Sequence, residues 1–340
     1  MSQFFAEYGL FLLKVLTIVV GIIVVIGVAA AAGRRGSQEG LEVDSLNDKY
    51  RSIAHALKKA VLSKHDRKQH DKAEKQRRKQ EAKRTDSRPR SFIINFKGDL
   101  KATGAASLRE EVSAVLDVAT PDDEVIVRLE NYGGVVHEHG LAASQLVRIR
   151  EADIPLIVCV DKVAASGGYL MACVANSIYA APFAILGSIG VLAQIPNFHR
   201  ALDSHGVDFE QISAGKYKRT VTMFGKNTEE DRAKLREELE DVHALFKSAV
   251  AKYRPDLDLD SIATGEHWYG TRAVELGLAD GIRTSDELLR ERAAERDLYE
   301  VRYKIKQPLQ KRLIANIDSL LSRADSLSWR RRFESRLPRS

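Results

Sequence analysis

A serine in a glycine-rich turn is the residue of this sequence best suited to covalent chemistry. Ser166 lies in the segment Ala164-Ala-Ser-Gly-Gly168, which follows an apolar run. A serine that cleaves amide bonds needs an exposed hydroxyl on a sharp turn and backbone N–H groups that face the developing oxyanion. Small neighbours let a substrate approach, and the start of a following helix offers free N–H groups. Ser166 is therefore a candidate nucleophile, although a serine-capped turn or a phosphate-binding loop has the same composition.

A serine of this kind needs a base, and residue types alone do not single one out among the lysines of the chain. The segment with Lys216 and Lys218 is indicated only by the family resemblance described below. Lys216 and Lys218 are two residues apart, so they would share one face of a strand, and their residue types do not distinguish them. An ordinary lysine titrates near 10.4, and lowering its pKa to about 7 costs roughly 4–5 kcal/mol. Desolvation in an apolar pocket can supply that shift. Tyr217, Val221 and Met223 are candidate walls of such a pocket.

Histidines offer an alternative base. His137 and His139 follow a Gly-Gly turn, and together with Glu138 they also form a possible metal-ligand set. The segment has the composition of a helix start, where histidines more often face solvent. We therefore expect neither a histidine base nor a metal site here, and the sequence indicates no cofactor elsewhere.

Strand and helix signals alternate from residue 91 onward, which predicts an α/β fold with a largely parallel sheet. Each expected strand is a short apolar run, and each expected helix has apolar residues at helical spacing. The expected strands are 92–96, 124–130, 155–160 and 177–181. The expected helices are 105–118, 137–150, a short one ending at 175, and 228–254, which begins with acidic residues as the helix dipole prefers.

The two glycine turns should lie at the same edge of this sheet. The turn at Gly133 and Gly134 and the turn at Ser166 each come directly after an expected strand. In parallel sheets, sites form at the carboxyl ends of the strands. The sequence therefore predicts that the two turns meet there.

An uncharged segment near the N-terminus predicts a membrane anchor. Val15–Gly33 contains nineteen uncharged residues, and that length spans roughly 28 Å as a helix. Leu10–Leu13 extend it. The run Ala29–Ala32 resembles a signal-peptide cleavage site, but the first seven residues carry no basic side chain, so we expect an uncleaved anchor. Arg34 and the residues after it favour a cytoplasmic domain, yet large domains can translocate despite their charge, and the orientation stays open.

The segment after the anchor carries more positive charge than the net charge of +6, so the rest of the chain is slightly acidic. Between Lys58 and Arg90 there are fourteen Lys or Arg residues and five Asp or Glu residues. This basic arm carries no aromatic residue for stacking on bases, so we do not expect nucleic-acid binding. It could lie on anionic lipid headgroups instead. The apolar spacing from Leu46 to Val61 predicts a helix, and the rest of 37–90 reads as a solvated helix or linker.

Two other features concern packing. Cys159 and Cys173 lie in apolar stretches, where free cysteines usually fill a core. From Pro308 to Arg332 a further helix is expected, with an apolar stripe that could dock on the chain itself or on another subunit.

Five segments together resemble the signal peptide peptidase A family of bacterial membrane serine peptidases, and most closely its SohB-like branch. They occur in the family's order and cover about residues 91–285. The segments are Asn131-Tyr-Gly-Gly134, Asp161–Tyr169, Leu186–Val191, Gly215-Lys-Tyr-Lys218 and Gly265–Asp280.

The resemblance implies a ClpP/crotonase-like fold and a Ser-Lys dyad. Ser166 then corresponds to the nucleophile, Lys218 to the general base, and Ser188 to the serine that orients the lysine. The N–H groups of Gly133 and Gly167 correspond to the oxyanion hole. Family members often have Ser-Pro-Gly-Gly where this chain has Asn-Tyr-Gly-Gly, so the adjacent substrate cleft can differ while both glycines remain.

These observations combine into one expected organisation. We expect an anchor (1–36), a basic helical linker (37–90), a peptidase domain (91–285) and a helical C-terminal extension (286–340). The expected function is a single-pass endopeptidase of the bacterial inner membrane that acts on signal peptides or other membrane-derived polypeptides. The resemblance also implies a homo-oligomer in which the lysine can come from a neighbouring subunit. The alternatives are an acyl-CoA thioester enzyme of the crotonase fold and a non-catalytic membrane scaffold.

Overall fold

The computed structural model describes residues 8–22, 39–81 and 88–305, and it divides into two units. The first unit comprises residues 1–40 and 304–340, and its main described element is a helix over residues 8–22. Among the described residues, no helix is both long and apolar enough to cross a membrane. Much of the expected span Val15–Gly33 and the whole expected helix after Pro308 lie outside the described residues.

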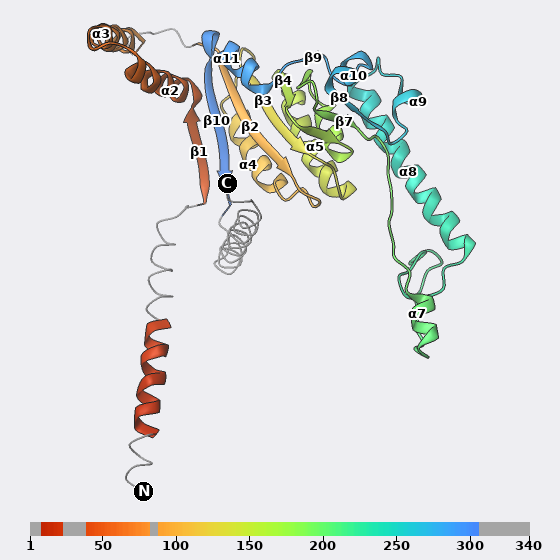
Figure 1. Cartoon of the computed structure of the whole chain (residues 1–340). Coiled ribbons are helices and arrows are strands. Elements are labelled where there is room, and N and C mark those ends of the chain that lie inside the picture. Colours follow the sequence, from red (N-terminus) through yellow and green to blue (C-terminus); the bar gives the residue numbers. More distant parts are fainter. Residues whose placement is uncertain (1–7, 23–38, 82–87, 306–340) are drawn as a thin grey trace, which may run out of the picture. The chain divides into compact units, whose positions relative to one another are not determined.

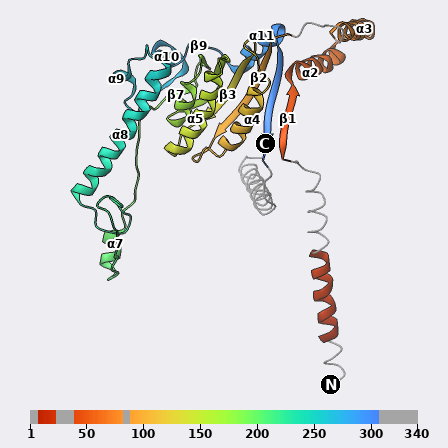
Figure 2. The same ribbon diagram turned by 180° about the vertical axis from the view of Figure 1, so that it is seen from behind.

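The second unit, residues 41–303, is built around one mixed sheet (Figures 1 and 2). Its main path runs β1-β10-β2-β3-β4-β6-β9, and all the neighbours from β10 to β9 pair in parallel. A branch leads from β3 to β5 and β7 in parallel and then to β8, which is antiparallel. The strands are β1 (Gly40–Ser45), β2 (Arg90–Gly98), β3 (Glu124–Asn131), β4 (Leu156–Val160), β5 (Val163–Ala165), β6 (Ser177–Ala180), β7 (Ile185–Gly187), β8 (His267–Tyr269), β9 (Gly281–Ile282) and β10 (Asp297–Lys304).

Helices cover both faces of the sheet because successive strand residues point to opposite sides. On β3, Val125 and Val127 pack with α4, α5 and α6, whereas Ile126 packs with α2 and α11. The predicted α/β fold with a largely parallel sheet is thus confirmed. The helices are α2 (Leu46–Val61), α3 (Lys64–Glu81), α4 (Ala105–Leu116), α5 (Val136–Glu151), α6 (Gly167–Ala172), α7 (His199–Ser204), α8 (Glu229–Tyr253), α9 (Leu259–Ile262), α10 (Gly270–Glu275) and α11 (Ser285–Glu295).

The sheet extends beyond the range 91–285 expected for the peptidase domain. β1 lies within the expected linker, and β10 lies within the C-terminal segment that we expected to be helical. β10 pairs with β2 from Asp297 to Val301, and its buried residues Leu298 and Val301 contribute to the core. Residues from both ends of the chain therefore complete the sheet.

Both cysteines fill the core, as expected. Cys159 on β4 and Cys173 after α6 are free and fully buried. Burial raises the pKa of each thiol to about 12, so neither is ionised at neutral pH.

One buried carboxyl makes the stability of the domain depend on pH. Glu111 on α4 is 6% exposed, and the backbone N–H of Tyr303 donates to its Oε1 at 2.8 Å. Burial raises the pKa of Glu111 to about 7, although the bond from Tyr303 acts in the opposite direction. The folded state therefore holds this proton more tightly than the unfolded chain does. The resulting stability is complete below about pH 4.5 and is lost as the pH rises through about 7.

Replacing Glu111 with Gln should remove this pH dependence. The amide oxygen can still accept from Tyr303, and no charge has to be buried. We expect Glu111→Gln to be more stable than the wild type at pH 8, by up to about 3 kcal/mol, and to differ little from it at pH 4.5. Denaturant unfolding at the two pH values measures the difference. Glu110→Gln is the matched control, at the neighbouring half-buried position whose carboxylate pairs with Arg109. An equal gain for Glu111→Gln at both pH values would contradict this explanation.

Candidate active site

Three parallel strands end side by side at the position of the candidate nucleophile. Asn131 at the end of β3 pairs with Ala164 on β5, and Ala165 on β5 pairs with Gly187 on β7. The residues that follow these strand ends are the Gly133 turn, Ser166 and Ser188. The prediction that the two glycine turns meet at one edge of the sheet is confirmed, and a third turn joins them.

Ser166 has the backbone conformation of a sharp strand-to-helix turn. It has φ 52° and ψ −121°, stands between β5 and α6, and is half-buried. A positive φ is uncommon for a residue with a side chain and costs of order 1–3 kcal/mol. The surroundings hold it there, because its N–H donates to Gly187 O at 2.8 Å and its carbonyl accepts from Leu170 at 3.0 Å. The strain therefore presents the side chain at the edge of the sheet instead of within a regular element.

Ser188 occupies the equivalent place on the neighbouring strand. It also has a positive φ, 53°, and its N–H donates to Glu266 O at 2.6 Å. Because Ser166 and Ser188 each follow one member of the pair Ala165–Gly187, the structure brings the two serines to adjacent strand ends.

Glycine is required where the Gly133 turn approaches Ser166. An ideal Cβ built on Gly133 would lie 2.7 Å from Ser166 Cβ and 2.8 Å from Gly167 N. Gly133 also has φ 85°, which favours glycine. A Cβ on Gly167 would lie 2.6 Å from the ring of His139. Gly133 thus allows the turns of β3 and β5 to touch, and Gly167 allows the start of α6 to approach His139 on α5.

The two expected oxyanion donors differ in their bonding. Gly167 is the first residue of α6, where an N–H group has no partner within the helix. The N–H of Gly133, in contrast, donates to Asn131 Oδ1 at 2.9 Å, an Asx-turn contact between residues i and i+2. Asn131 was noted in the sequence only as a departure from the family motif, and its contact with Gly133 was not anticipated.

An apolar cavity of about 210 Å³ lies beside Ser166. One wall comes from the C-terminal half of α8, whose lining residues follow the i, i+3, i+4, i+7 spacing of a helix face. This wall was missed from the sequence, because the long helix gave no sign of what it covers. Besides Ser166, the lining residues are Gly134, Val136, His139, Gly140, Gly167, Leu170, Gly190, Val191, Val242, Leu245, Phe246 and Ala249.

Lys218 does not line this cavity. It is exposed, and its N–H closes a turn by donating to Gly215 O at 3.1 Å. The neighbouring ring of Tyr217 lies 5.0 Å from Nζ of Lys234, which precedes the cavity residue Val242 by about 12 Å along α8. Figures 1 and 2 show the segment between α7 and α8 beside the N-terminal end of α8, away from the sheet. The candidate base and the candidate nucleophile are therefore apart within one chain.

The rival lysine is a poorer base. Lys216 Nζ lies 3.2 Å from Glu230 and 4.9 Å from the ring centre of Tyr217. Bonds to Tyr217 and Glu230 raise the pKa of Lys216, which keeps its ammonium charged. The proposed walls Tyr217 and Met223 are both exposed in this chain.

A histidine base does not fit the geometry. His139 lines the cavity, but Nδ1 lies 3.0 Å from Val135 O and Nε2 lies 3.2 Å from Asn131 Oδ1. Both ring nitrogens are thus engaged away from the serine hydroxyl. His137 is exposed and lies 3.8 Å from the Glu138 carboxylate, so the structure does not bring His137, Glu138 and His139 together around one point.

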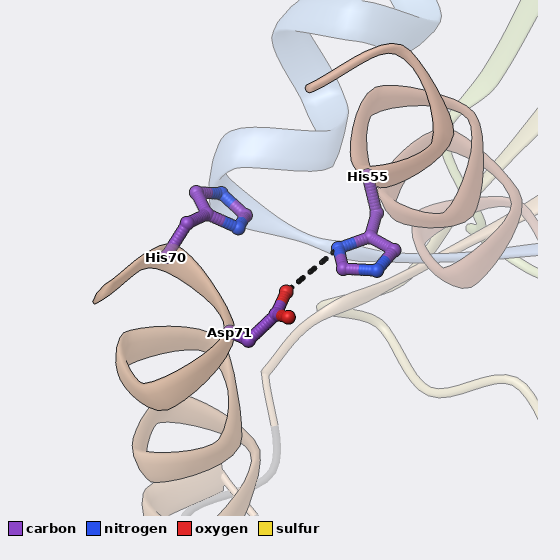
Figure 3. A group of neighbouring side chains, drawn as sticks. All are labelled: His55, His70 and Asp71. Atoms are coloured by element: carbon purple, nitrogen blue, oxygen red, sulfur yellow. Dashed lines mark ion pairs between the residues drawn. The ribbon is translucent and has the colours of Figure 1, made fainter. Parts of the chain in front are cut away.

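A different trio faces one another between α2 and α3. His55 lies near His70 and Asp71, with His55 Nδ1 3.9 Å from Asp71 Oδ1 (Figure 3). Two imidazoles and a carboxylate are ligands that zinc accepts. However, the Lys58 ammonium lies 3.0 Å from His70 Nε2, and α3 carries twice as many basic as acidic residues. Because this positive surrounding opposes a bound cation, we assign no metal to the trio.

Comparison of the sequence with known protein families shows to which family the chain belongs. Residues 3–146 match the N-terminal region of peptidase family S49, and residues 148–299 match the peptidase family S49 domain. The chain belongs to peptidase family S49. The resemblance to the signal peptide peptidase A family is therefore confirmed.

The SohB relatives are similar over most of the chain, and a signal peptide peptidase relative over about half of it. The probable protease SohB of Haemophilus influenzae is 44% identical over 326 residues, which is 92% of each chain. The probable protease SohB of Buchnera aphidicola from Acyrthosiphon pisum is 52% identical over 231 residues, 68% of this chain and 69% of that protein. A putative signal peptide peptidase SppA of Enterococcus faecium is 30% identical over 168 residues, 48% of each. The expected function class is confirmed: the protein is a serine peptidase of family S49.

Proposed function

We propose that Ser166 is the nucleophile of this S49 peptidase and that Lys218 is its general base. Ser188 orients the lysine, and the N–H groups of Gly133 and Gly167 bind the oxyanion. The observation that carries this proposal is the conformation of Ser166, which has a positive φ, contacts the Gly133 turn and lies beside an apolar cavity.

The reaction follows from these roles. Neutral Lys218 takes the proton of the Ser166 hydroxyl while the serine oxygen attacks the substrate carbonyl. The N–H donors stabilise the resulting oxyanion. The amine then leaves with a proton from Lys218, and the acyl group stays on Ser166. Water, activated by the same lysine, releases the acyl group and restores the serine.

The lysine is supplied by a neighbouring copy of the chain. In a single chain Lys218 is exposed, whereas a lysine base must be desolvated to be neutral. An assembly in which the Gly215–Lys218 turn of one subunit reaches the Ser166 cavity of the next provides both contact and desolvation. This arrangement makes the active enzyme a homo-oligomer.

The substrates are released signal peptides and other polypeptides of membrane origin. The cavity beside Ser166 is lined mainly by apolar side chains, which suits apolar peptide segments. The similarity to a putative signal peptide peptidase agrees with this substrate class. We further propose that Val15–Gly33 is a single-pass anchor in the bacterial inner membrane and that the basic arm lies on anionic headgroups. The peptidase domain then comprises the expected range 91–285 together with β1 and β10, which complete its sheet.

Active-site labelling tests the nucleophile directly. A fluorophosphonate probe should phosphonylate the purified full-length protein in detergent, and peptide mass spectrometry should place the adduct on Ser166. Lys218→Ala should slow labelling at neutral pH, because the hydroxyl then has no base. An adduct on any other serine, or equal labelling of Ser166→Ala, would overturn the assignment.

A further inference from the structure

The first turn of α2 is fixed to the core of the peptidase domain. Leu46 is buried and packs with leucines of α11 and β10. Asn47 is buried as well, and its Nδ2 donates to Ala293 O at 3.2 Å and to Arg296 O at 3.1 Å. Its Oδ1 accepts from the N–H of Leu298 at 2.7 Å. The direction in which α2 leaves the domain is therefore set by α11 and β10.

The apolar stripe of α2 continues beyond this contact and is then uncovered. At 3.6 residues per turn, five apolar side chains fall within about 40° of Leu57 around the helix. They are Leu46, Tyr50, Ile53, Leu57 and Val61. The first two pack on the core. The last three, the outer stripe, are 59%, 64% and 71% exposed. An exposed apolar stripe with a polar rim marks an interaction surface.

The neighbouring helix α3 lies on the polar side of α2 and leaves the outer stripe free. Figure 3 shows His55 of α2 facing Asp71 of α3, with 3.9 Å between Nδ1 and Oδ1. Lys58 Nζ lies 3.0 Å from His70 Nε2. His55 is about 160° around α2 from the middle of the outer stripe. The sequence of α3 contains a single alanine as its only apolar residue, so α3 has no apolar face to offer.

Basic side chains flank the outer stripe on both sides. Lys49 and Lys58 are exposed and lie about 80° and 100° to either side of Leu57. The one acidic residue of α2, Asp48, is on the opposite side of the helix. A second copy docked through the same face would bring like charges together. An apolar stripe between basic flanks is instead typical of a helix that lies in the interface of an anionic bilayer.

The length of the connecting chain keeps α2 close to the proposed anchor. The anchor segment ends at Gly33, and α2 begins at Leu46, thirteen residues later. Even a fully extended chain of this length spans no more than about 45 Å. The start of α2 therefore stays within about that distance of the bilayer, where the local concentration of lipid headgroups is high.

We propose that α2 is an interfacial membrane helix whose outer stripe, Ile53, Leu57 and Val61, inserts into the surface of an anionic bilayer. Lys49 and Lys58 then reach the headgroup phosphates on either side. Because the first turn of α2 is bonded to α11 and β10, the insertion fixes how the peptidase domain faces the membrane. This inference deepens the proposed location of the basic arm by adding apolar insertion, and it rests on the proposed anchor but not on Ser166.

A fluorophore on the outer stripe reports whether it enters lipid. Both native cysteines are buried with pKa values of about 12, so a thiol reagent labels only an introduced cysteine in the folded protein. Leu57→Cys is labelled with an environment-sensitive nitrobenzoxadiazole probe in the full-length protein, in vesicles of phosphatidylcholine and phosphatidylglycerol. We expect its emission to shift to the blue, and lipid brominated near the headgroup end of its acyl chains to quench most of it.

Ser52→Cys is the matched control on the same helix. Ser52 is exposed, its hydroxyl donates only to Lys49 O, and it lies about 140° around α2 from Leu57. Its probe should keep the emission of an aqueous surface and escape quenching by the brominated lipid. Ile53→Cys, on the outer stripe, should repeat the result of Leu57→Cys and replaces it if that variant does not fold.

The lipid composition tests the basic flanks. In vesicles of phosphatidylcholine alone, the ratio of inserted to free helix should fall about fivefold for each lysine that reaches an anionic headgroup. The blue-shifted fraction of the Leu57→Cys emission measures this ratio. An equal fraction with and without phosphatidylglycerol would contradict the role of Lys49 and Lys58.

The outcomes separate this inference from the rest of the proposed function. A protein that does not float with the vesicles overturns both the anchor and the interfacial helix. A protein that floats while the Leu57→Cys probe stays aqueous overturns the helix alone. A blue-shifted probe that brominated lipid does not quench also overturns it, because protein then covers the stripe, either the segment after Pro308 or a second copy. The same spectra in a Ser166→Ala background keep the result independent of the nucleophile.

Discussion

Ser166→Ala is expected to abolish peptide hydrolysis, with kcat lower by about 10⁴–10⁶, as for loss of the nucleophile in other serine peptidases. Without the hydroxyl no acyl-enzyme can form, and the oxyanion donors and the cavity alone accelerate peptide hydrolysis only slightly. The measurement is turnover of casein and of an apolar fluorogenic peptide by the full-length protein in detergent.

Alanine is a suitable replacement at this position because it keeps the Cβ atom. The positive φ of Ser166 is therefore equally strained in the variant, and the fold should unfold at nearly the same temperature. Ser144→Ala is the matched control, since the Ser144 hydroxyl donates only to Gly140 O on the exposed side of α5. Unchanged turnover in Ser166→Ala, or an equal loss in Ser144→Ala, would contradict the assignment.

Much of the sheet could be predicted because its signals are local. The apolar runs that became β2, β3 and β4 are buried on both faces along most of their length, as the parallel pairing of a covered sheet demands. The strand–turn–helix order around Ser166 was visible for the same reason. β1 could not be recognised, since its apolar residues Leu41 and Val43 stay exposed and its place depends on β10 at the other end of the chain.

The relations between site residues could not be predicted from spacing. Ser166 and Ser188 are neighbours only because β5 and β7, each three residues long, pair in one register. The contact between Asn131 and His139 needs a strand end and a helix to pack at a fixed angle, which no periodicity encodes. The sequence with its family resemblance therefore supplied the candidate residues, and packing revealed what surrounds them.

The position of Lys218 was beyond sequence reasoning for another reason. Its loop contacts the N-terminal half of α8, whose residues from Glu229 to Asp241 are largely exposed. Apolar side chains of the segment between α7 and α8, among them Ile212 and Phe224, are exposed as well. The proposal that a second copy covers this segment would explain why so little of it is buried in its own chain. Such a contact lies between two chains, so it cannot be derived from the fold of one chain.

Mixing two inactive variants should restore activity if the lysine acts across a subunit boundary. Ser166→Ala lacks the nucleophile and Lys218→Ala lacks the base, so each alone is expected to be inactive. In a head-to-tail assembly formed at random from equal amounts of both, a site is complete when a Lys218→Ala subunit receives its lysine from a Ser166→Ala neighbour. Random pairing makes about a quarter of the sites complete, whereas a lysine acting within its own chain gives none.

For the test, the two variants are co-expressed with different affinity tags and purified through both tags. The turnover of the mixed assembly is then measured. Each variant mixed with the Ser166→Ala/Lys218→Ala double variant is the matched control, because neither mixture can form a complete site. Size-exclusion chromatography must show that the mixed assembly has the wild-type size. Activity near a quarter of the wild type would then place Lys218 in the neighbour's site. An inactive mixed assembly of normal size would contradict this, and the Gly215–Lys218 turn would have to fold back onto Ser166 of its own chain.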